Sequence, residues 1–142
     1  MIDGANGEIG WIMEAGMNQF SPGICVDLNK DGVDEIIFVE NKLVDQETFT
    51  MGNQLRVFDI KNDSSYYLGA ERNGICLAST PTIGDLDSDG HFEIVTITAE
   101  LDQRFNSKFC EMQLTPIKAK PERITWPGYL GPLENGILLQ LK

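Results

Sequence analysis

Two short stretches of this sequence place oxygen-bearing side chains at every second position and then add a glycine and an acid. The first, DLNKDGVDEIIFV, covers residues 27–39, and DLDSDGHFEIVTI repeats its plan over residues 85–97. Alternate positions of a tight loop can turn their oxygens inward. A hard divalent cation such as calcium needs six to eight oxygens at roughly 2.3–2.6 Å. The spacing therefore predicts two cation sites.

Each position of these loops has an expected role in coordination. Positions 1, 3 and 5 supply side-chain oxygens, the glycine at position 6 permits a sharp turn, position 7 offers a backbone carbonyl, and an acid at position 9 closes the shell. The predicted ligands of the first loop are Asp27, Asn29, Asp31, the Val33 carbonyl and Glu35. Those of the second loop are Asp85, Asp87, Asp89, the His91 carbonyl and Glu93.

The charge of the loops supports a bound ion. Two carboxylates about 5 Å apart repel by on the order of 3 kcal/mol at an effective dielectric near 20, and a cation removes that penalty. Asp87 stands where the first loop has Asn29, so the second loop carries one more formal charge among its own ligands. On this count we expect the second loop to bind calcium more tightly.

The segments around the loops have the pattern of strands. Runs rich in β-branched residues or alternating between two faces predict strands over 34–40, 53–60, 66–70, 93–100, 108–114 and 137–141. A polar connection is expected over 41–52 and a proline-bearing segment over 115–136. Helical signal is weak throughout, so the chain is predicted to be an all-β protein of short antiparallel strands.

The loops do not fit an EF-hand. That motif needs a bidentate glutamate at position 12 and flanking helices, whereas position 12 is Phe38 or Thr96 and both flanks are strand-like. The stretches SPGICVDLNKDGVDEIIFV and STPTIGDLDSDGHFEIVTI instead resemble the FG-GAP or VCBS type of β-propeller repeat, found in integrin α-subunits and secreted bacterial proteins. In that family a calcium loop joins the first two strands of a blade, and GNQLRVFDI is similar to the third strand.

The resemblance implies antiparallel four-stranded propeller-type blades. Residues 1–20 would end a preceding blade, 21–78 would form a complete blade with the first calcium loop, and 79–142 a second blade with the second loop. Propellers close with about four to eight blades, whereas this chain supplies about two to two and a half. We therefore expect one propeller fragment over 1–142, completed by the remainder of a longer chain or by other copies.

The composition limits which classes of partner and which cellular compartment we expect. Eleven basic against twenty-two acidic residues give a formal net charge of −11, which disfavours nucleic acid and anionic membranes, and no apolar run suggests membrane insertion. Calcium loops of this type bind weakly enough to suit the outside of a cell, so an extracellular or cell-surface location is expected, with any signal peptide upstream. The three cysteines are interpreted mainly as buried thiols.

Catalytic signal is weak. The single histidine, His91, is assigned a backbone role with its side chain at the surface, and the carboxylates are committed to the ions, so we do not expect an enzyme. The leading hypothesis is a calcium-stabilised extracellular binding or scaffold module with a protein or glycan ligand on a propeller face. The alternatives are part of a secreted polysaccharide-degrading enzyme, and a self-assembling surface or fibre subunit.

Overall fold

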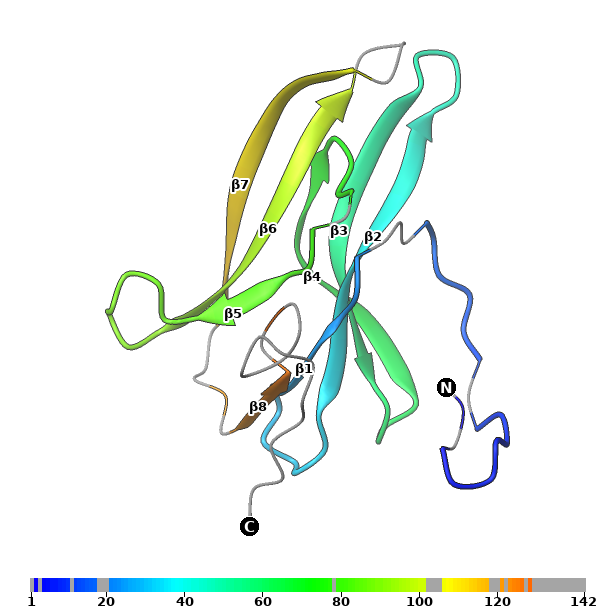
Figure 1. The fold of residues 1–142 in the computed structure, drawn as a ribbon, viewed down its shortest axis with the longest axis vertical. Helices are drawn as coiled ribbons and strands as arrows, with labels where there is room; N and C mark the ends of the chain where they lie inside the picture. Colours follow the sequence, from blue (N-terminus) through cyan, green and yellow to red (C-terminus); the bar gives the residue numbers. More distant parts are fainter. Residues whose placement is uncertain are drawn as a thin grey trace.

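The computed structural model describes residues 2, 4–10, 12–17, 21–77, 79–101, 106–117, 121, 123–126 and 128. Within this part of the chain every regular element is a β-strand, which confirms the all-β prediction (Figure 1). The strands are β1 (Ile24–Asp27), β2 (Glu35–Asp45), β3 (Thr50–Asp59), β4 (Ser64–Asn73), β5 (Thr82–Gly84), β6 (Phe92–Leu101), β7 (Ser107–Ile117) and β8 (Arg123–Trp126).

The strands pair antiparallel in two open sheets. The first has the order β4-β3-β2-β1-β8 and the second the order β5-β6-β7. Strands β1 to β4 follow one another as in a propeller-like blade, and β5 to β7 repeat its first three strands. The expected count of four strands per sheet becomes five and three, because β8 pairs with β1 instead of extending the second sheet.

Strands β2 and β3 are longer than the sequence pattern predicted. The polar residues expected to form a connection over 41–52 continue the ladder, with Lys42 opposite Gly52, and the turn is confined to 46–49. The Asp45 carboxylate accepts hydrogen bonds from the backbone N–H groups of Glu47 (2.8 Å) and Thr48 (3.4 Å), which closes this turn. Strand β8 lies in the proline-bearing segment and was not predicted; the strand predicted over 137–141 lies outside the described residues.

Both sheets contribute to one hydrophobic core. Alternation along β2 and β3 turns one face of the first sheet toward the second, and burying an aliphatic side chain completely stabilises the fold by about 1.5–3 kcal/mol. The buried members of the core are Ile24, Val26, Ile37, Val39, Leu55, Val57, Cys76, Ile83, Ile94 and Ile117. None of the three cysteines, all of which lie in the described residues, forms a disulfide: Cys76 is buried as expected, Cys25 is half-buried, and Cys110 is exposed.

Two buried asparagines hold the crossing from the first sheet to the second. Asn41 donates to the Cys76 carbonyl (3.0 Å) and accepts from the Cys76 N–H (2.8 Å), while Asn53 donates to the Gly74 carbonyl (3.0 Å). Gly74 has φ 96°, and a Cβ there would lie 2.8 Å from the Ala99 carbonyl oxygen. The crossing therefore needs a glycine, and the amide side chains fix it against β2 and β3.

The segment 12–17 is anchored on the face of the first sheet opposite the core. Met17 forms an isolated antiparallel bridge with Asn41, and the Gly16 N–H donates to the Glu40 carboxylate. Arg56 bonds the same carboxylate at 3.0 Å and the Glu14 carbonyl at 3.3 Å. These contacts attach the backbone of the segment to the buried Glu40 and the half-buried Arg56.

Candidate metal centre

The first loop joins β1 to β2, with Asp27 as the last residue of β1 and Glu35 as the first of β2. The Asp27 carboxylate accepts the N–H groups of Asp31 (3.1 Å) and Gly32 (3.0 Å). Lys30 and Gly32 have φ of 63° and 85°, the left-handed conformation that lets the chain reverse within a few residues. The acids that begin and end the motif thus also shape its backbone.

The second loop, between β5 and β6, repeats this frame except for the bond from the Asp31 N–H to Asp27, whose counterpart from Asp89 to Asp85 is absent. Four backbone N–H groups in each loop donate to loop side chains. The first-loop pairs are Leu28 to Glu35, Asp31 to Asn29, Gly32 to Asp27 and Val33 to Asp31, and the second-loop pairs are Leu86 to Glu93, Asp89 to Asp87, Gly90 to Asp85 and His91 to Asp89. Ser88 and Gly90 also repeat the positive φ values. The sequence repeat is therefore a repeat of conformation.

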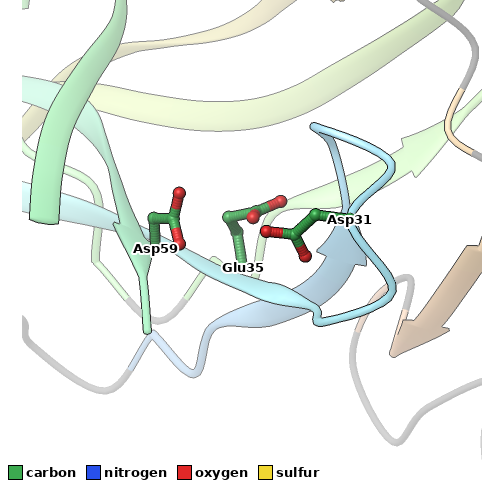
Figure 2. Close-up of side chains that lie close together, drawn as sticks. All are labelled: Asp31, Glu35 and Asp59. Carbon is green, nitrogen blue, oxygen red and sulfur yellow. The ribbon is translucent and has the colours of Figure 1, made fainter. Parts of the chain in front are cut away.

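Carboxylates gather beside the first loop, and one of them comes from outside it. Ligand atoms of Asp31, Glu35 and Asp59 all lie within 4.8 Å of one another. Figure 2 shows Glu35 between the other two, with Asp31 reaching it from the loop and Asp59 from the end of β3. The motif missed Asp59 because it lies far along the sequence. The register of the β2–β3 hairpin explains the contact, because Ile36 pairs with Phe58 and the next residues along the two strands are Glu35 and Asp59.

The electrostatics of this cluster differ from residue to residue. Burial raises the pKa of Glu35, the Leu28 N–H opposes that rise, and the neighbouring carboxylates of Asp59, Asp31 and Asp27 raise it further. Hydrogen bonds from Asn62 first, and then from Asn29, hold the pKa of Asp59 below its ordinary value. Three acids at such distances are the arrangement a divalent cation stabilises.

One cationic side chain reaches the first cluster. Lys61 lies 2.8 Å from the Asp31 carbonyl oxygen and 3.5 Å from an Asp31 carboxylate oxygen. About half of its side chain is exposed, so solvent screens its charge. Lys61 therefore offsets part of the charge of Asp31, and among the described residues no cationic side chain pairs with Glu35 or Asp59.

The second cluster is more open. Ligand atoms of Asp85, Asp87 and Asp89 lie within 4.8 Å of one another, and Figure 1 shows this loop projecting from the sheets. The Asp85 Oδ1 atom is buried and has no hydrogen-bond partner. A buried carboxylate oxygen without a donor is costly unless something else satisfies it, and a cation would do so.

The structure places the ten predicted ligand residues in different roles. Five of them supply the carboxylates of the two clusters: Asp31, Glu35, Asp85, Asp87 and Asp89. Asp27, Asn29 and Glu93 accept loop N–H groups, and Asn29 also donates to Asp59 at 3.2 Å. Val33 and His91 occupy the turn after each glycine, and the His91 side chain is exposed as predicted. The clusters consist of oxygen ligands alone, which suits a hard cation.

Comparison of the chain with known sequence families, with curated proteins and with solved structures finds no match. The relation to FG-GAP or VCBS repeats thus stays a prediction that depends on the two loops and their strand context.

Proposed function

We propose that this chain is a calcium-stabilised, non-enzymatic extracellular module of FG-GAP or VCBS type that acts as a scaffold for a protein or glycan ligand. The observation that carries the proposal is the repeated loop frame, in which backbone N–H groups orient carboxylates that would otherwise repel. Calcium fits these sites better than magnesium because it accepts many oxygens in an adaptable geometry. The unsatisfied Asp85 Oδ1 supports the same assignment.

The ion would act on the fold at the point where strands meet. Each loop joins the first two strands of its sheet, so a bound cation ties the end of β1 to the start of β2, and the end of β5 to the start of β6. A ligand that binds only the folded state stabilises it by mass action. Calcium is therefore assigned a structural role.

Calcium titration and thermal unfolding test this proposal together. Calorimetric titration with CaCl₂ should reveal two binding events. Removing calcium with a chelator should lower the melting temperature by several degrees. Magnesium at the same concentration serves as the control and should bind more weakly. Absence of calcium binding together with an unchanged melting curve would contradict the proposal.

The ligand surface is proposed from what the sheets leave exposed. Ile97, Met112 and Leu114 lie on one face of the second sheet and are about half exposed or more. The acidic composition argues against nucleic acid as the ligand. No apolar helix that could span a membrane occurs in the described part of the chain.

A second candidate function, a self-assembling surface or fibre subunit, is supported by the edge of the second sheet. Within the described residues β7 has a paired strand only on the β6 side, although β3, its counterpart in the first sheet, pairs with β4 on its other side. Long edge strands readily pair with strands of other chains. Another copy could therefore complete the second sheet.

A further inference from the structure

We propose that Asp59 is a ligand of the ion in the first loop, and that this contribution from β3 makes the first site the tighter of the two. The inference rests on the proposed calcium binding and adds a residue outside both loop motifs. It also reverses the affinity order that the formal charges within the loops suggest.

Asp59 is held in position before any ion arrives. Its side chain is 8% exposed, and its Oδ1 atom accepts the Asn62 N–H at 3.0 Å. Its Oδ2 atom accepts the side-chain amides of Asn62 (2.7 Å) and Asn29 (3.2 Å). The Lys61 backbone N–H also lies beside this carboxylate, so the donors orient Asp59, and a cation would share its roughly four lone-pair sites with them. The contact from Asn29 places Asp59 directly beside the loop.

Glu35 gives a separate indication that a cation belongs here. The residue is 2% exposed, and of its two carboxylate oxygens only Oε2 receives a hydrogen bond, from the Leu28 N–H at 2.7 Å. The carboxylate lies between Asp31 and Asp59, which cannot donate to it when ionised (Figure 2). Because Glu35 is a buried residue whose Oε1 atom accepts no hydrogen bond from the described residues, a cation shared with Asp31 and Asp59 would supply a partner for that oxygen.

The second loop lacks this arrangement. The residue opposite Glu93 in the β6–β7 ladder is Pro116, so β7 offers no carboxylate where β3 offers Asp59. Counting the acids around each site, the first has Asp27, Asp31, Glu35 and Asp59, and the second has Asp85, Asp87, Asp89 and Glu93. The number of acids is then equal, although Lys61 offsets part of the charge of Asp31 at the first site. The two sites differ in burial. Asp27, Glu35 and Asp59 are buried, whereas the second cluster is exposed to water, which weakens its attraction for the ion.

Binding would also reach beyond the loop. Asn62 contacts both Asp59 oxygens from the turn that connects β3 to β4. An ion held by Asp59 therefore fixes this turn as well as the β1–β2 loop, and residues 60–63 should exchange their amide hydrogens more slowly in calcium.

The test measures calcium affinity at one loop at a time. Asp85→Ala leaves the first site, and Asp27→Ala leaves the second. In the Asp85→Ala protein, adding Asp59→Asn should weaken calcium binding by at least about tenfold, since fewer charged ligands lower affinity. In the Asp27→Ala protein the same change should leave binding unaltered.

Asp45→Asn, which removes a charge at the far end of β2, is the matched control and should change neither affinity. The Asp85→Ala protein should itself bind calcium more tightly than the Asp27→Ala protein.

Each failure has its own signature. If the unmodified chain binds two calcium ions but Asp59→Asn leaves the affinity of the first site unchanged, Asp59 is not a ligand although the proposed function stands. If no calcium binds to the unmodified chain, the proposed function itself fails. Should Asp59→Asn not fold, hydrogen exchange of the unmodified chain decides, because unchanged exchange at residues 60–63 on adding calcium would overturn the inference.

Discussion

Two glutamates on β2 show how surroundings decide the behaviour of a carboxylate. Glu35 and Glu40 are both buried, but they lie on opposite faces of the first sheet. Glu35 faces other acids, and burial together with their charge raises its pKa. Burial also raises the pKa of Glu40, but the Gly16 N–H, the Tyr67 hydroxyl and the Arg56 guanidinium outweigh that effect and lower it. Glu40 is thus satisfied within the chain, whereas the partner proposed for Glu35 is a cation.

Replacing Glu40 should reveal its contribution through pH. Glu40→Gln should lower the free energy of unfolding at pH 7 by on the order of 2–3 kcal/mol, because the largely covered Arg56 side chain loses its ionic partner. The pKa of Glu40 is lowered on folding, so its stabilising effect is present above the ordinary value of 4.5 and disappears as pH falls through the folded value. Chemical denaturation of both proteins between pH 7 and pH 3 should show the difference shrinking.

Glu47→Gln is the matched control for that comparison. Glu47 lies exposed in the β2–β3 turn, and this substitution should leave stability within about 0.5 kcal/mol at every pH. A Glu40→Gln effect that stays constant over the whole range would show that packing, and not charge, is what Glu40 supplies.

Strand β8 contacts the first loop directly although it is only four residues long. It pairs with β1, with Asp27 opposite Arg123 and Val26 opposite Ile124. Arg123 bonds Asp34 at 2.8 Å and the Gly32 carbonyl at 3.0 Å, so one side chain contacts the loop both before and after Val33. The strand therefore covers the edge of β1 and braces the loop that begins there.

Removing the Arg123 side chain should loosen this edge and leave the rest of the sheet intact. In Arg123→Ala, hydrogen exchange of the paired β1 and β8 amides should accelerate, because the β1–β8 edge can then open locally by breaking fewer contacts. The β3 amides should keep their protection. Arg72→Ala, at an exposed position on β4 at the opposite edge of the same sheet, is the control and should leave β1 exchange unchanged. Equal exchange at β1 in Arg123→Ala and the unmodified chain would show that strand pairing alone holds β8.

The whole molecule is an open structure with unequal sheets and a large negative charge. The first sheet is bordered by β4 and β8, whereas the described part of the second ends at the eleven-residue strand β7. Ile97 and Met112 stand opposite each other on its exposed face, with Leu114 beside them. A net charge of −11 opposes association of copies unless cations reduce it. Calcium would therefore favour assembly as well as folding.

The self-assembly candidate predicts a calcium-dependent mass. In calcium, sedimentation should give a multiple of 15.8 kDa, and chelation should shift the protein toward that value. Leu114→Glu should abolish the larger species, because it places a charge on the face beside the free edge of β7. Val44→Glu, at an exposed site near the tip of the β2–β3 hairpin, is the control and should still assemble. A mass of 15.8 kDa under all conditions would reject self-assembly and leave the scaffold proposal in place.

Local sequence patterns were sufficient to predict strands around each loop. β-Branched runs identified the first half of β2 and nearly all of β6, since side-chain alternation and the residues of a tight turn act over a few positions. The extension of β2 and β3 through polar residues was missed, because a cross-strand ladder can continue wherever its partner continues. Strand β8 was missed for the same reason, as its pairing with β1 depends on contacts between distant parts of the chain.

By itself the sequence determined the all-β class and the paired loop motif, because turn geometry and acid spacing are local properties. Only the tertiary structure decided that Asp59 joins the first loop, that Pro116 holds the corresponding position beside the second, and that β8 closes the edge of β1. These outcomes depend on strand register and on which sheet edge is free. Register and edge pairing arise from the packing of the whole chain, so no short segment encodes them.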